Sequence, residues 1–395
     1  MAGIDAVRQS LPCWLDVDLD AIAANVGALR RWMGPHPRIA AVVKAQAYGL
    51  GAVAVSRAAL EAGANWLAVA RVHEAEDLRR AGLDAPILVL NRTDETDAES
   101  AVRLGLRVTV DTPALGRALG TAARRMGRPA RVHVKVDTGL HRFGVAPDRA
   151  LPLVRELSSI DGLDVEGLYT HFASSDEDPA YTLEQLHCFT RIKTVLACHG
   201  YDFPIHHAAN SAATLGFPES HLDLVRVGIS LYGVSPAVDV PPGLGLLPAV
   251  ALRGRIARVS ELAPGEGVGY GQTWHAARPT RVGLVTAGYA DGVPRSLSNR
   301  GAALVRGTRA PIIGRVSMDQ TTIDVTEISD VAVNDVVTLF GGDGDAEISL
   351  HEYGASSQTI PHEALTRIGA RVARVYRTDD AVGRVARLSG EVAAS

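Results

Sequence analysis

The chain has 395 residues, of which 47% are hydrophobic and 21% charged, and its formal net charge is −4 with the histidines neutral. This composition is typical of a soluble globular protein of two domains, and the dispersed lysines and arginines argue against a nucleic-acid partner. No apolar stretch approaches the roughly 20 residues of a membrane span, residues 1–10 lack a signal-peptide core, and three cysteines without metal-ligand spacing indicate reduced thiols in a cytoplasmic protein without a metal.

The first two thirds of the chain alternate short apolar runs with amphipathic segments. Strands are expected at 39–44, 66–70, 87–91, 107–111, 131–137, 165–171, 205–210 and 224–231. Helices are expected at 19–32, 53–61, 72–80, 113–125, 148–157 and 183–198. Eight strands in sequence, most followed by a helix, favour a closed α/β (β/α)8 TIM-type barrel over residues 14–247, although an open doubly wound sheet has the same local pattern.

The sequence pattern changes after about Pro248. Short β-rich runs at 252–259, 282–287, 303–305, 310–316, 321–325 and 336–340 are separated by Gly, Pro and Asn-Asp turns. We therefore predict a mostly β C-terminal domain over residues 248–380. Residues 381–395 have no strong periodicity and form a tail.

Lys44 ends the first predicted strand, directly after the apolar run 39–43. An ammonium in an apolar wall has lost its water, which lowers its pKa and makes the neutral amine a usable nucleophile. A lysine whose ammonium group reaches solvent and takes no part in catalysis would give the same sequence pattern. Because the carboxyl ends of barrel strands meet on one face, Lys44 should share that face with other strand-end polar residues.

Other motifs fall at these strand ends. Lys135-Val-Asp-Thr-Gly with Arg142 provides two cations, although a surface ion pair would have the same sequence. His171 ends another strand, where core histidines are common, and Ser211 after Asn210 is placed to cap a helix and help bind an anion. Arg226-Val-Gly228-Ile229 belongs to the eighth unit, where barrels often bind phosphate, although Gly228 could serve packing alone.

A reactive lysine, a phosphate site and an arginine directed at a ring suit pyridoxal phosphate held as a Schiff base. The motifs that carry this interpretation also resemble those of the alanine racemases, collinearly from Trp14 to Tyr376. They are Val-Val-Lys-Ala-x-Ala-Tyr-Gly (42–49), Lys-Val-Asp-Thr-Gly (135–139), Tyr-Thr-His-Phe-Ala (169–173), Asn-Ser-Ala-Ala-Thr (210–214), Arg-x-Gly-Ile-x-Leu-Tyr-Gly (226–233), Gly-Tyr-Ala-Asp-Gly (288–292) and Gly-Arg-Val-x-Met-Asp-Gln (314–320).

The resemblance implies a pyridoxal-phosphate-dependent isomerase that interconverts L- and D-alanine with two bases. Lys44 would hold the cofactor and act on one face of the substrate, and Tyr289 of a partner subunit in a homodimer would act on the other. Arg226 would face the pyridine nitrogen, and His171 would link Tyr289 to Arg226. The remaining cofactor contacts would come from Tyr48, Asn210, Ser211, Gly228, Ile229 and Tyr232.

The resemblance also implies the substrate contacts. Arg142 and the backbone at Met318 would orient the substrate carboxylate and the phenolic oxygen of the cofactor. Lys135 would brace Arg142, at a position that is often carbamylated in the family. An always-charged arginine cannot protonate a pyridine nitrogen, so Arg226 favours a racemase over a decarboxylase of the same architecture.

Three residues depart from the family pattern. Gln46 stands where Asn or Asp is usual, Leu50 where His is usual, and His362 where a tyrosine would touch the phosphate and the substrate side chain. Because a pocket discriminates by only about 1–3 kcal/mol per methylene, His362 predicts activity on serine or another small amino acid. The sequence is also compatible with a racemase of a different amino acid in a biosynthetic pathway. A non-catalytic cofactor-binding protein built from the barrel alone would lack the β-domain motifs 288–292 and 314–320, both of which are present.

Overall fold

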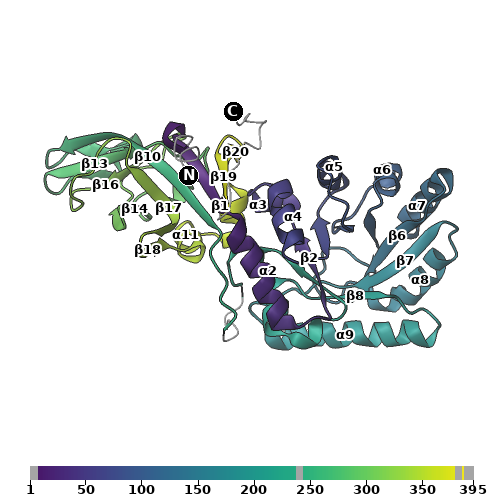
Figure 1. Cartoon of the computed structure of the whole chain (residues 1–395). Coiled ribbons are helices and arrows are strands. Elements are labelled where there is room, and N and C mark those ends of the chain that lie inside the picture. The colour runs from purple at the N-terminus through teal and green to yellow at the C-terminus, as the bar shows by residue number, and fades with distance from the viewer. Residues whose placement is uncertain (1–7, 237–242, 379–384, 387–395) are drawn as a thin grey trace. The chain divides into compact units, whose positions relative to one another are not determined.

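The computed structural model describes residues 8–236, 243–378 and 385–386 (Figure 1). The chain divides into two compact units. The barrel unit comprises residues 21–47 and 52–247, and the β unit comprises residues 1–20, 48–51 and 248–395. Among the described helices, none has the length and apolar character needed to cross a membrane.

The barrel unit is built on eight parallel strands in the order β8-β7-β6-β5-β4-β3-β2-β9. They are β2 (Arg38–Val42), β3 (Trp66–Val69), β4 (Ile87–Val89), β5 (Arg107–Val110), β6 (Ala130–Lys135), β7 (Leu163–Tyr169), β8 (Ile205–His207) and β9 (Leu224–Val227). The two ends of the sheet meet where the amide of Arg226 donates to the carbonyl of Ala209 at 3.0 Å. The result is a nearly closed barrel, which confirms the predicted fold class.

Helices lie around these strands (Figure 1). They are α2 (Leu19–Met33), α4 (Ala52–Glu61), α5 (Val72–Arg80), α6 (Ala98–Arg103), α7 (Pro113–Met126), α8 (Ala150–Ser158), α9 (Pro179–Cys198) and α10 (Ser211–Gly216). The six predicted helices are confirmed, whereas α6 and α10 are too short for a periodic signal. The strands end before the predicted limits because the polar residues that follow them, Lys44 included, belong to loops.

The β unit contains a larger sheet around β10 (Val250–Leu262), which pairs antiparallel with β1, β13 and β17. Its other strands are β1 (Cys13–Asp18), β13 (Thr280–Val285), β14 (Ala302–Val305), β15 (Thr308–Pro311), β16 (Thr321–Asp324), β17 (Val336–Asp343), β18 (Ala346–Ile348), β19 (Ala373–Arg377) and β20 (Val385–Ala386). A small hairpin, β11 (Gly267–Val268) and β12 (Trp274–His275), and the helices α11 (Leu350–Ser356) and α12 (Pro361–Thr366) complete the unit.

The unit boundaries differ from the predicted domains in two places. Strand β1, expected within the barrel range 14–247, pairs with β10 and with β19, so the chain enters the β unit first. Residues 48–51 also belong to the β unit, where Tyr376 Oη donates to the carbonyl of Leu50 at 2.9 Å. Most of the predicted tail 381–395 lies outside the described residues, but β20 within it pairs with β19.

Two motif loops of the β unit, 288–292 and 314–320, are joined through their backbones. The amide of Tyr289 donates to the carbonyl of Ser317 at 3.0 Å, and the amide of Ala290 donates to the carbonyl of Met318 at 2.9 Å. A Cβ atom added to Gly288 would lie 2.4 Å from the carbonyl oxygens of both Ser317 and Met318. Glycine is therefore required at 288 by the close approach of the two loops.

We expect Gly288→Ala to destabilise the β unit, because the new methyl group would push apart two backbone segments. The expected loss in free energy of unfolding is about 1–3 kcal/mol, measured as a lower urea midpoint for the transition of this unit. Gly342→Ala is the matched control, since the nearest atom to a Cβ at that position would be 4.0 Å away. Equal midpoints for the two variants would contradict the close-packing requirement.

Candidate functional site

Lys44 does not end β2 but begins the short turn α3 (Lys44–Tyr48). The next three residues, Ala45, Gln46 and Ala47, have φ values of 51, 57 and 52°, in the left-handed helical region. This conformation costs L-residues about 1–2 kcal/mol each, and such outliers cluster at functional sites. Burial lowers the pKa of the half-buried Lys44, Arg142 lowers it further and Glu74 opposes them. The lowered pKa favours the neutral, nucleophilic amine.

Glu74, in the first turn of α5, holds the turn that carries Lys44. Its Oε1 accepts from the amide of Ala45 at 2.6 Å, while Oε2 accepts from the amides of Ala70 and Arg71 at 2.7 and 2.9 Å. This role was missed from the sequence, although a glutamate three residues after the N-cap position, here Arg71, is part of a capping box. Gln46, noted above for its departure from the family, accepts from the amide of Ala52 at 3.2 Å and so holds the start of α4.

Four cations act on the pKa of His171, which follows β7. Burial lowers the pKa of His171 well below its usual range, and Arg226, Arg142, Lys135 and Lys44 lower it further. Its Nδ1 atom accepts from Nη2 of Arg226 at 3.0 Å. The barrel unit therefore brings together five of the predicted site residues, and their positive charge suits an anionic ligand.

Lys135 is buried, and its Nζ donates to the carbonyl of Phe143 at 2.6 Å. Burial lowers the pKa of Lys135 to about 8, with smaller contributions from Arg142 and Arg226. Arg142 is exposed, and its guanidinium lies 5.9 Å from the centre of the Phe143 ring. A cavity of about 660 Å³ adjoins Arg142 in the barrel unit. It is lined by Arg71, Val72, His73, Asn91, Arg92, Thr93, Asp94, Asp97, Arg142 and Phe143.

The residues after β8 and β9 are tied to one another. Asn210, not Ser211 as expected, caps α10, because the helix begins at Ser211 and Asn210 Oδ1 accepts from the amide of Ala213 at 2.9 Å. The Ser211 hydroxyl instead accepts from the amide of Gly228 at 2.9 Å. The amide of Gly228 is therefore already engaged within the barrel unit.

Ile229 and Tyr232 lie in the buried 3-10 turn that follows Gly228. Tyr232 Oη donates to the carbonyl of Val42 at 3.1 Å. This bond ties the segment after β9 to the end of β2, two residues before Lys44.

Tyr48 and His362 come together in the β unit. Their ring centres are 5.9 Å apart with an interplanar angle of 41°. Burial raises the pKa of the Tyr48 hydroxyl to about 12. Leu50, which also departs from the family pattern, is fully buried and serves packing in this unit.

The motif loops of the β unit expose large side chains. Tyr289 is 45% exposed and Met318 is 53% exposed. A residue missed from the sequence is Tyr270, which is 72% exposed and lies between Gly269 and Gly271, each with a φ of 71°. A Cβ atom on Gly271 would lie 3.0 Å from Nη1 of Arg315, so a cation lies against this tyrosine loop. The signal in the sequence is an aromatic residue between two glycines.

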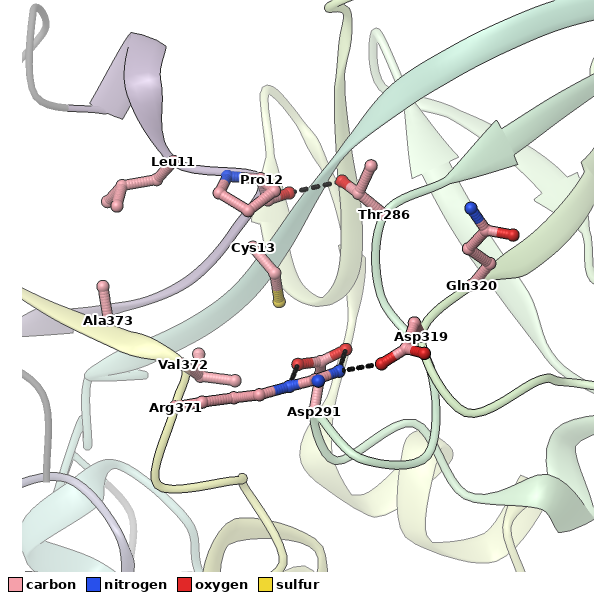
Figure 2. A pocket seen from close by; sticks show the side chains of 10 residues that line it. All are labelled: Leu11, Pro12, Cys13, Thr286, Asp291, Asp319, Gln320, Arg371, Val372 and Ala373. Carbon is pink, nitrogen blue, oxygen red and sulfur yellow. Dashed lines mark hydrogen bonds and ion pairs between the residues drawn. The ribbon is translucent and has the colours of Figure 1, made fainter. Parts of the chain in front are cut away.

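A second cavity, of about 540 Å³, lies beside the same motif loops in the β unit (Figure 2). Its lining comprises Leu11, Pro12, Cys13, Thr286, Asp291, Asp319, Gln320, Arg371, Val372 and Ala373. Figure 2 shows Arg371 between two carboxylates, with Nε 2.8 Å from Asp291 and Nη2 2.6 Å from Asp319. The two aspartates belong to different motif loops, so Arg371 joins the loops by charge as their backbones do by hydrogen bonds.

Comparisons with known proteins agree along nearly the whole chain. Residues 17–236 match the family model for the alanine racemase N-terminal domain, and residues 249–376 match the C-terminal domain. The chain is 44% identical over 368 residues to an alanine racemase of Desulforamulus reducens, covering 92% of this chain and 99% of that one. It is also 44% identical over 374 residues to an alanine racemase of Symbiobacterium thermophilum, covering 94% and 98%.

Solved structures give the same result. The alanine racemase from D-cycloserine-producing Streptomyces lavendulae has a TM-score of 0.89 at 39% identity, covering 93% of this chain and 97% of that one. The Bacillus anthracis alanine racemase with bound L-Ala-P has a TM-score of 0.89 at 36% identity, covering 96% and 98%. The barrel with its strand-end cations, the β unit and these matches together show that the chain belongs to the alanine racemase family and is an isomerase of that family.

Proposed function

We propose that this protein interconverts L- and D-alanine with pyridoxal phosphate attached to Lys44. The observation that carries the proposal is the amine of Lys44, whose pKa is lowered by burial and by Arg142, and whose charge acts on His171 together with those of Lys135, Arg142 and Arg226. An amine beside several cations fits a carbonyl cofactor that bears a phosphate, together with a substrate that bears a carboxylate. When bound, this cofactor supplies the electron sink that makes the Cα proton of an amino acid removable.

The chain's own residues would divide the binding work. Arg142 and the backbone at Met318 would hold the substrate carboxylate. Arg226 would face the pyridine nitrogen as a fixed cation, which cannot give up a proton there and so favours racemisation over decarboxylation. Asn210, which caps α10, would position Ser211, and His171 would position the guanidinium of Arg226. The residues around the phosphate would be Tyr48, Ser211, Gly228, Ile229 and Tyr232. The free thiols Cys13, Cys188 and Cys198 support a cytoplasmic location.

Racemisation removes a proton from one face of Cα and returns one to the other, so two bases on opposite faces suit the reaction. Lys44 would serve one face, and a tyrosine from the β unit of a second copy would serve the other. Tyr289 is the candidate from the sequence, and Tyr270 is the candidate that the structure adds. Greater exposure and the neighbouring Arg315 favour Tyr270, because a residue that completes a partner's site must be accessible in its own chain.

Lys44→Ala should remove both the visible absorbance of the bound cofactor and the racemase activity, because no other amine would replace the covalent link. The change should leave the far-ultraviolet circular dichroism unaltered, since Lys44 lies on a loop. Lys193→Ala, on the outer helix α9, is the matched control. Retained absorbance and activity in Lys44→Ala would contradict the central assignment.

Tyr270→Phe and Tyr289→Phe should differ in their effect on alanine racemisation. Loss of the second base should slow racemisation by about 100-fold or more, while Lys44 continues to exchange the Cα proton of one enantiomer with deuterated solvent. NMR would monitor deuterium exchange at Cα. The variant that still exchanges this proton but no longer racemises alanine identifies the tyrosine that acts as the second base. Near-normal racemisation in both variants would exclude both tyrosines.

The proposed homodimer can be tested by mixing two inactive variants. Lys44→Ala mixed with the inactive tyrosine variant should form hybrid dimers in which one site carries both defects and the other is intact. Statistical mixing would restore about one quarter of wild-type activity. Failure to restore any activity, despite subunit exchange seen with tagged chains, would place both groups of a site in one chain.

We expect serine or another small amino acid to be racemised beside alanine, because His362 stands next to Tyr48 where the family has a bulkier tyrosine. His362→Tyr should lower kcat/KM for serine relative to alanine by about tenfold. His275→Tyr, at an exposed position on β12, is the control. Activity on alanine alone in the wild-type protein would refute this expectation.

Lys135 is proposed to carry a carbamate that braces Arg142. Carbamylation requires the neutral amine, and with a pKa of about 8 roughly one amine in ten is neutral at pH 7, a fraction that rises as the pH passes 8. At fixed dissolved ¹³CO₂, a carbamate ¹³C signal should therefore grow from pH 7 to pH 9 and be absent in Lys135→Arg. An equal signal in that variant, or none in the wild type, would contradict the modification.

A further inference from the structure

The interior of the barrel contains a relay of ionisable side chains, Arg226, His207, His133, Glu166 and Arg107, most of which the proposed reaction does not use. Nη1 of Arg226 lies 2.7 Å from Nδ1 of His207, and Nε2 of His207 lies 2.8 Å from Nδ1 of His133. Nε2 of His133 lies 3.2 Å from Glu166, whose carboxylate also accepts from Nε and Nη2 of Arg107 at 3.0 and 3.3 Å. In this order the residues come from β9, β8, β6, β7 and β5 of the barrel unit.

The groups at either end of the two imidazoles determine the direction of every hydrogen bond between them. A guanidinium only donates, so Nδ1 of His207 must accept and its proton lies on Nε2. That proton is donated to Nδ1 of His133, which therefore also carries its own proton on Nε2. The carboxylate of Glu166 only accepts, and it receives this last proton. Both imidazoles are held in one neutral tautomer.

The charge states agree with that direction. Burial raises the pKa of Glu166, but its hydrogen bonds to His133 and Arg107 outweigh burial and lower it to about 2, so the carboxylate stays charged. Burial lowers the pKa of His133, although Glu166 opposes this, and lowers that of His207 well below its usual range. Both rings are therefore neutral at neutral pH.

Ring contacts hold the two imidazoles in place. Tyr169 stacks on His207 with ring centres 4.4 Å apart and an interplanar angle of 8°. Trp66 packs against His133 at 5.7 Å and also lies under the guanidinium of Arg107 at 5.0 Å. The relay is thus fixed by packing as well as by hydrogen bonds.

Arg226 needs such a relay because its direct partners carry no negative charge. Its guanidinium donates to the carbonyls of Thr170 and Ala208, at 2.9 and 2.8 Å, and to the imidazoles of His171 and His207. Packing alone does not call for five polar side chains in a barrel core, since apolar residues of similar volume are often as stable or more so.

We propose that Glu166 is a positioning residue that fixes the guanidinium of Arg226 through the single tautomers of His133 and His207. The positioning of Arg226 by Glu166 does not depend on the proposed function. Only its consequence rests on that function, namely that a fixed cation faces the cofactor ring. Arg107 holds Glu166, and Glu166 in turn sets the two imidazoles. Glu166 thereby influences the orientation of Arg226 in the candidate site without contacting Arg226 directly.

The tautomers can be measured without cofactor chemistry. In protein labelled with ¹⁵N-histidine, assigned with His133→Gln and His207→Gln, both side chains should appear as neutral rings protonated at Nε2 at pH 7. A ring protonated at Nδ1, or at both nitrogens, would overturn the inference whatever reaction the protein catalyses. In Glu166→Gln the amide can donate to Nε2 of His133 as well as accept from it, so the reverse tautomers, in which His207 no longer accepts from Arg226, become accessible. His133 should then appear as a mixture of tautomers, whereas a single unchanged tautomer would overturn the role of Glu166.

The catalytic consequence separates a positioning role from a merely structural one. Glu166→Gln should lower kcat for alanine by about tenfold or more, as outer-shell changes commonly do, with a smaller change in KM, and Glu166→Asp should recover part of the loss. The control is Glu156→Gln, which breaks an exposed ion pair with Arg117 at 2.6 Å and should leave kcat unchanged. If Glu166→Gln does not fold, His133→Gln is judged by the same kcat criterion.

Unchanged kcat in the folded variant would overturn the inference while leaving the proposed function intact. Absence of racemisation in the wild-type protein loaded with pyridoxal phosphate would overturn the proposed function. The tautomer result would still decide the inference in that case.

Discussion

Burial of positive charge is the constraint on which the barrel unit depends. The charges of four cations lower the pKa of His171, namely those of Lys44, Lys135, Arg142 and Arg226. Burial lowers the pKa of both lysines and brings that of Arg226 to about 10. Such a cluster is unfavourable in isolation, because each cation has lost water or gained a like-charged neighbour. Backbone carbonyls accept hydrogen bonds from Lys135 and Arg226, and the carboxylate of Glu166 is connected to Arg226 through two imidazoles. The cluster is suited to anionic ligands.

The left-handed turn after Lys44 is a second unfavourable feature with a local compensation. Four consecutive non-glycine residues, 45–48, have a positive φ, and the left-handed conformation costs an L-residue about 1–2 kcal/mol. Glu74 offsets part of this cost because its carboxylate accepts hydrogen bonds from three backbone amides, one in the turn and two in the segment before α5. The same carboxylate thus links the end of β3 to the loop that carries Lys44, and it limits how far that loop can relax.

The β unit holds its two motif loops, 288–292 and 314–320, by backbone contact and by charge. Gly288 lets two motif loops approach until their carbonyl oxygens leave no room for a Cβ atom, and Arg371 bridges the carboxylates of Asp291 and Asp319. Rigid loops of this kind can present Tyr270, Tyr289 and Met318 at the surface at little entropic cost. Large exposed side chains on a rigid base are suited to contact with another molecule, which agrees with the proposed second copy.

The sequence by itself determined the number and order of the barrel strands and the change to a β-rich unit after about residue 248, and it indicated Lys44 as the candidate reactive lysine. Those features follow from apolar periodicity and from the high cost of a buried ammonium, both of which are local properties. The sequence did not show that β1 joins the second sheet, because an apolar strand carries no information about which of two sheets it will enter. Nor did it show which residue caps α10, since Asn210 and Ser211 are both good caps and the first helical residue decides between them.

Only the tertiary structure decided how the polar residues are connected. Glu74, His133, Glu166 and Arg107 lie far apart in the sequence, and each alone resembles an ordinary surface or core residue. Closure of the barrel brings five strands together. Arg226 can only donate and the carboxylate of Glu166 can only accept, so these two residues determine which ring nitrogen of His207 and of His133 carries the proton. A residue's hydrogen-bonding role depends on the partner that the fold supplies, and for that reason these roles could not be predicted before the barrel was known.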